Sequence, residues 1–222
     1  TDSSLEILRR YAADDPRFVI IDKPNSGYGA SMNRGLDVAR GEYVGIVESD
    51  DVASPKMFKK LYQFAKKHDC DIVKSNYYEY DGQTDAFQDV FGNFRCGEVF
   101  DVREDLDVLK MIPIIWAAIY RRSMLVETGV RFNETPGASF QDTSFVFRAW
   151  VASRRIALLR DAYLHYRVSR AESSVKSDSK VFEVCSEYDM SYDFLHQDPQ
   201  RVEDFGGLIN VVKLGTYRWN YN

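Results

Sequence analysis

Short apolar runs alternate with amphipathic stretches along the first half of the chain, as they do in βα units. Residues 18–21, 43–47 and 71–73 have the length and composition of buried strands. Between them, apolar side chains recur at helical spacing in 32–39 and 57–64, which indicates amphipathic helices. The pattern therefore predicts an α/β domain with a mostly parallel central sheet flanked by helices.

The second half of the chain is less regular. Residues 75–100 mix aromatic and polar side chains, a composition that fits either a hairpin or a loop over a cleft. Apolar spacing predicts a helix over 139–152 and two adjacent strands at 155–159 and 163–166. Beyond residue 175, apolar residues at helical spacing predict C-terminal helices.

Composition limits the class of protein. With 222 residues, 45% hydrophobic and 28% charged, the chain can bury a sizeable core and is not a disordered segment. Its net charge of -5 argues against a nucleic-acid partner. Three scattered cysteines fit neither a disulfide framework nor a zinc site, and no apolar run approaches the roughly 20 residues of a membrane span. We expect a cytoplasmic domain.

An acidic cluster directly follows the predicted strand at 43–47: Glu48, Asp50 and Asp51. The carboxyl ends of parallel strands form the edge where α/β domains bind ligands. Carboxylates two apart in extended backbone lie on one side and suit Mg²⁺ or Mn²⁺, which in turn binds diphosphate oxygens. The alternative is a polar turn ahead of a helix that starts at Ser54.

Asp142 and His165 are two further candidates. Asp142 lies where the predicted helix begins, and its spacing from Ser139 is that of a capping box. The functional alternative is a general base that accepts a proton from an acceptor hydroxyl. His165 alternates with apolar neighbours along a strand, which fits a packed histidine as well as a metal ligand.

The order of these segments resembles the family 2 inverting glycosyltransferases, whose fold is the GT-A nucleotide-sugar domain. The matching segments are residues 1–4, 25–36, 39–44 and 48–51, followed by looser matches at 116–121, 132–134, 141–143 and 163–167. The resemblance implies a GT-A domain over 1–175 and a C-terminal helical extension over 176–222. It also implies that the first strands of the family's fold precede residue 1, so that the GT-A domain is incomplete at its N-terminus.

The resemblance assigns roles to the acidic residues. Asp50 resembles the metal-binding aspartate of the family's Asp-x-Asp motif, and Asp142 resembles the catalytic base. Glu48 stands at the first acidic position of that motif, and Gln141 replaces an acid before the base. We interpret both departures as changes that adjust the activity of the enzyme without abolishing it. Asp50, with Glu48 and His165, is the expected metal site, for Mn²⁺ or Mg²⁺.

A donor site is implied as well. Its expected residues are Asn25, Gly27, Asn33, Arg34, Glu48, Asp50 and Asp51. For Asn33 and Arg34 the alternative is helix packing and a surface charge. Donor binding and the packing alternative both fit a helix that follows a glycine-containing turn.

The reaction implied by the resemblance is a single displacement with inversion at the anomeric carbon. The expected donor is a nucleotide sugar, preferably a UDP-sugar, and the expected acceptor is a carbohydrate or a lipid-linked hydroxyl in bacterial-type polysaccharide or glycoconjugate synthesis. The expected location of this synthesis is the cytoplasmic side, at the inner face of the membrane. The resemblance leaves open whether the protein associates peripherally with the membrane and whether it forms a homo-oligomer. The alternatives are a non-catalytic GT-A-like binding domain and a nucleotidyltransferase, which requires a glycine-rich basic loop that this chain does not show.

Overall fold

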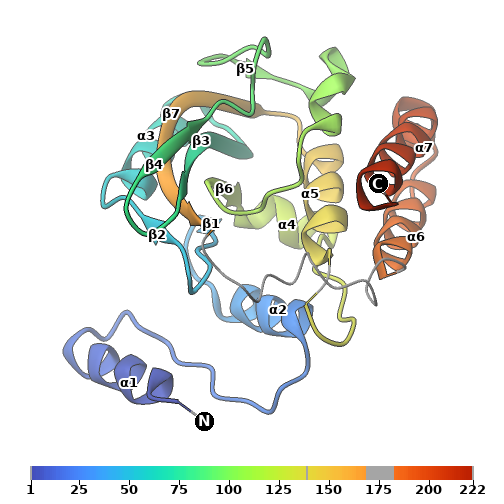
Figure 1. The fold of residues 1–222 in the computed structure, drawn as a ribbon. Helices are drawn as coiled ribbons and strands as arrows, with labels where there is room; N and C mark the ends of the chain where they lie inside the picture. Colours follow the sequence, from blue (N-terminus) through green and yellow to red (C-terminus); the bar gives the residue numbers. More distant parts are fainter. Residues whose placement is uncertain (1, 139, 169–182, 222) are drawn as a thin grey trace.

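The computed structural model describes residues 2–138, 140–168 and 183–221 (Figure 1). Its helices are α1 (Ser4–Asp14), α2 (Tyr28–Val38), α3 (Met57–His68), α4 (Arg122–Thr128), α5 (Gln141–Ala152), α6 (Glu183–His196) and α7 (Pro199–Tyr221), with the 3-10 turns η1 (Val102–Glu104) and η2 (Leu106–Lys110). Its strands are β1 (Tyr43–Gly45), β2 (Val52–Ala53), β3 (Ile72–Tyr80), β4 (Asp85–Gln88), β5 (Val99–Phe100), β6 (Ala118–Arg121) and β7 (Ile156–Arg167).

The strands form one mixed sheet in the order β1-β6-β3-β7-β2, with β4 added to β3 and β5 added to β7. The expected α/β class is confirmed, but the sheet is not mostly parallel. Among the described strands, β3 and β7 form the parallel pair, and the other pairs are antiparallel. The reason is that β6 inserts between β1 and β3 and runs opposite to both.

Helices cover the sheet and extend the core beyond it. Helix α3 packs on β3 and β6, while α5 packs on α4 and on α6. Figure 1 shows α5 between the sheet and the C-terminal pair of α6 and α7. Phe145 and Trp150 of α5 are buried in the same cluster as Ile72 and Ile119 of the sheet. The core therefore runs from the sheet through α5 to the C-terminal helices.

The N-terminal segment lies outside this core. Helix α1 contains no buried residue, and Figure 1 shows it set apart from the sheet. The predicted buried strand at 18–21 is wrong: Phe18, Val19 and Ile21 are 49%, 64% and 41% exposed. A strand requires a neighbour for its backbone hydrogen bonds, and no described strand pairs with this segment.

In the second half of the chain, a hairpin and one long strand precede the C-terminal helices. Residues 72–88 form a hairpin of β3 and β4, one of the two expected alternatives. The two strands predicted within 155–166 are a single strand, β7, because a bulge in its pairing with β3 absorbs the polar interruption. The expected C-terminal helices are present. The expected domain boundary at residue 175 lies outside the described residues. Among the described helices, none combines the length and the hydropathy of a membrane span.

Candidate active site

The acidic segment after β1 is a tight turn, in which the Asp51 N–H donates to the Glu48 carbonyl at 3.2 Å. The expected extended backbone at this point is therefore corrected. Two other elements hold the turn. The Tyr28 hydroxyl, at the start of α2, donates to Glu48 Oε1. At the end of β7, Arg167 donates its backbone N–H to Asp51 Oδ1 at 3.0 Å and its Nε to the Asp50 carbonyl at 3.1 Å.

The turn concentrates negative charge in a partly buried place. Burial raises the pKa of Glu48, with the neighbouring charge of Asp50 acting in the same direction. Burial likewise raises the pKa of Asp51 to about 6. Asp51 Oδ2 is buried and has no hydrogen-bond partner among the described residues. Each of these features favours a cation at the turn, because a cation offsets the cost of burying carboxylates.

His165 contacts the hairpin of β3 and β4, and its inclusion in the metal site stays a prediction. Its Nδ1 lies 2.7 Å from Asp85 Oδ1 of β4, and its ring stacks on Tyr78 with 5.2 Å between the ring centroids. These contacts hold the imidazole against the β3 and β4 hairpin. Within the described residues, no three His, Cys, Asp or Glu side chains form a metal-binding group.

The segment that leads into α2 approaches the backbone of residues 133–137 very closely. Asn25 Oδ1 accepts a hydrogen bond from the Gly27 N–H at 3.1 Å, and the Tyr28 N–H donates to the Gly137 carbonyl at 2.8 Å. Gly27 has a φ of +90°, which side chains other than hydrogen disfavour. A Cβ on Gly29 would lie 1.9 Å from the Asn133 carbonyl oxygen. Both glycines are therefore required by this contact.

The contacts of Asn33 favour packing, the alternative to its expected role in donor binding. Its Nδ2 donates to the Phe132 carbonyl at 3.0 Å and to Glu134 Oε1 at 2.8 Å, while its Oδ1 accepts from the Phe132 N–H at 2.9 Å. Because the amide is already used by the protein, it has little capacity for a ligand. Arg34 lies on the exposed side of α2, 3.9 Å from Asp37, and its donor role stays a prediction.

Asp142 lies in the first turn of α5, and its Oδ1 accepts from the Thr143 N–H at 2.9 Å. Phe140 is the N-cap residue of this helix, and Ser139 of the expected capping box lies outside the described residues. Burial raises the pKa of Asp142 to about 6; the charge of Glu48 acts in the same direction and that of Lys74 opposes it. Asp142 is therefore within electrostatic range of the acidic turn.

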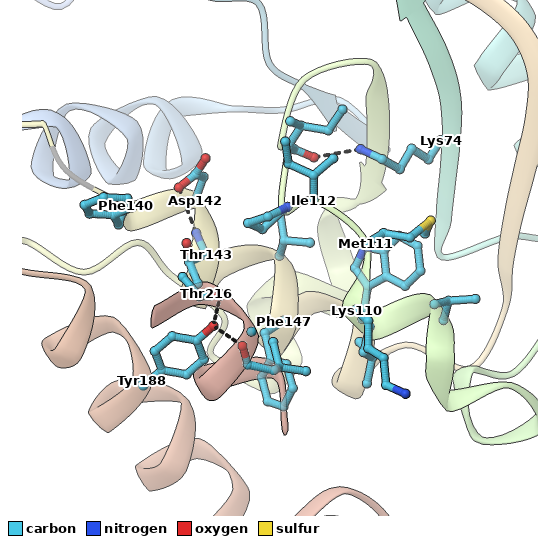
Figure 2. Close-up of a pocket in the computed structure, with 18 of the residues that line it drawn as sticks. Lys74, Lys110, Met111, Ile112, Phe140, Asp142, Thr143, Phe147, Tyr188 and Thr216 are labelled. Atoms are coloured by element: carbon cyan, nitrogen blue, oxygen red, sulfur yellow. Dashed lines mark hydrogen bonds between the residues drawn. The ribbon is translucent and has the colours of Figure 1, made fainter. Parts of the chain in front are cut away.

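A cavity of about 600 Å³ opens beside Asp142. Its walls come from β3, the segment 108–116, the start of α5, and helices α6 and α7 (Figure 2). Trp116 and Tyr166 stack in this wall with 4.9 Å between their ring centroids and an angle of 12° between their planes. The cavity thus places a flat aromatic surface and a carboxylate next to one space that can admit a ligand.

Three residues of this region were not predicted from the sequence as part of the site. Tyr28 and Arg167 hold the acidic turn, and both lie inside segments that match the family, so their position in the motifs was a usable signal. Lys74 lines the cavity. Its only signal is a lysine inside the apolar start of β3, which by itself also fits an exposed strand position.

The site thus combines an acidic turn after a strand with a carboxylate at a helix start beside a cavity. Residues 1–129 match the model of glycosyl transferase family 2, which is more than half of the 222-residue chain. The chain belongs to glycosyl transferase family 2.

Two relatives and one solved structure illustrate the likeness. The chain is 30% identical over 177 residues to the uncharacterized glycosyltransferase YibD of Escherichia coli strain K12, covering 74% of this chain and 50% of the relative. It is 30% identical over 201 residues to glycosyltransferase GlyG of Streptococcus pneumoniae serotype 4, covering 84% of this chain and 65% of the relative. The chain therefore spans half to two thirds of the length of these relatives.

The structural likeness is to S. aureus TarS, residues 1–349, in complex with UDP-GlcNAc. The TM-score is 0.65 at 21% sequence identity, covering 92% of this chain and 61% of that TarS chain. At this identity the likeness shows the fold alone, and it confirms the GT-A fold that the resemblance implied.

Proposed function

We propose that this chain catalyses the transfer of a sugar from a nucleotide-sugar donor to an acceptor hydroxyl with inversion, and that Asp142 is the general base. The observation that carries the proposal is the position of Asp142 on the cavity wall, within electrostatic range of the acidic turn. An acceptor in the cavity then meets the base, while the diphosphate of the donor lies at the turn. In this proposal the two reactants lie on either side of the reacting carbon.

Asp142 accepts the proton of the acceptor hydroxyl as the oxygen attacks the anomeric carbon and the nucleoside diphosphate departs. Burial raises the pKa of Asp142 to about 6, so the group is ionised at neutral pH and is a stronger base than an exposed aspartate. A base with a pKa near the working pH is the efficient case for proton transfer.

For Mn²⁺ or Mg²⁺, the donor set at the turn is suitable. Asp50 and Glu48 would hold the ion, and diphosphate oxygens would complete its coordination, since these hard cations take oxygen ligands from both protein and phosphates. Bound there, the cation offsets the charge that develops on the departing diphosphate. The unpartnered Asp51 Oδ2 adds to the negative field without being needed as a ligand.

The donor we propose is a UDP-sugar, and a solved structure of similar fold is a complex of TarS with UDP-GlcNAc. Asn25 and Gly27 precede Tyr28, which contacts Glu48, so a hydrogen bond links this segment of the expected donor site to the turn. The acceptor class we propose is a carbohydrate or lipid-linked hydroxyl, used on the cytoplasmic side of the membrane.

The test is transfer by the full-length protein from a panel of UDP-sugars with Mn²⁺. We expect turnover in the wild type and a fall of about 10²–10⁴-fold in Asp142→Asn, the contribution of a positioned base. UDP binding should persist in the variant. Glu127→Gln, an exposed carboxylate on α4, is the matched control and should keep its activity. Turnover in Asp142→Asn equal to the control would remove Asp142 from the mechanism, and nucleotide binding without any turnover in the wild type would favour the non-catalytic alternative.

A further inference from the structure

Lys74 is a buried cation that the proposed chemistry does not use. It lies near the start of β3, is 2% exposed, and lines the cavity beside Asp142 (Figure 2). Its Nζ donates one hydrogen bond, to the Ile114 carbonyl at 2.7 Å. An ammonium group has three donors, so two remain without an acceptor among the described residues.

This ammonium also lacks a counter-ion. Among the described residues no Asp or Glu oxygen lies within 4.0 Å of its Nζ, and the charge of Asp142 acts on it only from a distance. Burial lowers the pKa of Lys74 to about 7, because a buried cation is costly unless a partner compensates it. Lys110, the other lysine at this cavity, is half exposed and paired with Asp107.

We propose that Lys74 binds an anionic group of the acceptor, a phosphate ester or a carboxylate, beside the hydroxyl that is presented to Asp142. This inference rests on the proposed function, since it takes the cavity as the acceptor site. It narrows the acceptor to hydroxyl compounds that carry a negative charge close to the reacting position. A neutral sugar would leave the buried ammonium uncompensated.

The anion is not the diphosphate of the donor. Lys74 and Asp142 both line the cavity, whereas Glu48, Asp50 and Asp51 of the acidic turn do not. The cavity anion and the donor diphosphate at the turn are therefore assigned to separate places. In Figure 2 the side chains of Lys74 and Asp142 come from different walls of the cavity, β3 and the start of α5. One acceptor molecule can therefore place its hydroxyl at one wall and its anion at the other.

The remaining walls indicate what else the acceptor carries. Most of the lining is apolar, including Met111, Ile112 and Val212, and the stacked Trp116 and Tyr166 form its aromatic part. Such a lining favours a ring or chain with apolar faces over a fully hydrated ion. The cavity therefore suits an organic anion such as an acidic sugar or a sugar-like phosphate ester.

The experiment measures binding of three probes to the full-length protein through tryptophan fluorescence, because Trp116 and Trp150 line the cavity. The probes are methyl β-D-glucuronoside, glycerol 1-phosphate and the neutral methyl β-D-glucoside. The first two distinguish a carboxylate from a phosphate ester. Wild type and the control Lys110→Met should bind at least one anionic probe alike. Lys74→Met should lose about 10- to 100-fold in affinity for it, the value of a charge-assisted contact, and Lys74→Arg should recover part of this loss.

Binding by the wild type alone gives a second readout if Lys74→Met does not fold. The carboxylate probe stays ionised above neutrality, while Lys74 loses its proton as the pH rises through about 7. Affinity should therefore fall as the pH is raised from 6 to 8.5. A flat pH profile, equal binding of the neutral probe, or failure of both anions to bind the wild type would each overturn the proposal.

Two further outcomes separate this inference from the proposed function. Weaker UDP binding by Lys74→Met, with unchanged binding of the anionic probes, would assign the anion to the donor and overturn the inference alone. Absence of sugar transfer by the wild type would overturn the proposed function, and the direct binding result would still stand as evidence on Lys74.

Discussion

The Asp142 carboxylate costs the folded protein stability under the conditions in which it is useful as a base. Burial raises its pKa from the ordinary 3.8 to about 6. Between these two values the folded protein holds a proton that the unfolded chain has lost. The contribution of Asp142 to the free energy of unfolding therefore decreases as the pH rises through this interval, and the full cost is present above about pH 6.

Replacing Asp142 with Asn should remove that cost and keep an oxygen for the Thr143 N–H. We expect the melting temperature of Asp142→Asn to equal or exceed that of the wild type at pH 7.5. The difference should shrink as the pH falls below 6 and vanish below about pH 4, where the wild-type carboxyl is protonated in both states. Paired thermal melts across this range are the measurement. A clear loss of stability at pH 7.5 would instead support the helix cap as the main role of Asp142.

At the scale of single residues, the sequence indicated the acidic turn and Asp142 but missed Lys74. The acidic residues occupy short motifs whose spacing can be compared directly with a family. The burial of Lys74 depends on the segment 108–116, some forty positions away in the chain, which closes over β3 and supplies the Ile114 carbonyl. A local pattern contains no information about such a cover, so a strand lysine looks exposed.

Among the elements, α2 depends on a close backbone approach at its first turn. A Cβ at Gly29 would lie 1.9 Å from the Asn133 carbonyl oxygen, so α2 or the segment 133–137 must move to admit it. We expect Gly29→Ala to lower the free energy of unfolding by about 1–3 kcal/mol, the usual cost of overpacking. Urea denaturation measures this change.

Gly35 in the same helix provides the matched control. A Cβ there meets nothing within 4 Å, and the position is exposed. Gly35→Ala should therefore stabilise the protein by about 0.5–1 kcal/mol through helix propensity. Similar effects of the two substitutions would show that the approach at Gly29 is not a tight constraint.

The elements themselves were mostly predictable where periodicity is strong, as in α3, α5 and the C-terminal helices. The errors concern pairing. Residues 18–21 have the composition of a buried strand, but composition does not supply the neighbouring strand that burial requires. The prediction of a mostly parallel sheet was wrong for the same reason. Strand β6 runs antiparallel to β1 and β3, and no local pattern encodes the direction of a distant partner.

At the scale of the whole molecule, the C-terminal helices α6 and α7 complete the cavity. A buried polar cluster attaches α6 to α5 and to the segment that contains Asn133. Glu187 of α6 is fully buried and accepts hydrogen bonds from Ser144 Oγ of α5 and from Asn133 Nδ2, the latter at 3.0 Å. The next residue, Tyr188, lines the cavity together with Thr216 of α7. The attachment of α6 and the shape of the acceptor cavity are therefore coupled.

Removing the Glu187 carboxylate should weaken the attachment of α6 and α7 to the rest of the molecule. Glu187→Ala removes the acceptor of the buried Ser144 hydroxyl and of the partly buried Asn133 amide, which should lower the free energy of unfolding by about 1–3 kcal/mol. We also expect faster amide exchange in α6 and α7 than in the sheet. Asp189→Ala, at an exposed position of the same helix, should change stability by less than about 0.5 kcal/mol. Uniform exchange across the molecule in Glu187→Ala would argue against a separate role for the cluster.

Helix α1 stands outside this cooperative unit because none of its residues is buried. Its 11 residues fall short of the roughly 12–15 at which an isolated helix becomes even marginally stable in water. Its exposed apolar side chains, Ile7, Leu8 and Tyr11, gain nothing from the core. We therefore expect α1 to exchange between helix and coil with a relaxation time of about 0.1–1 μs, faster than the sheet unfolds.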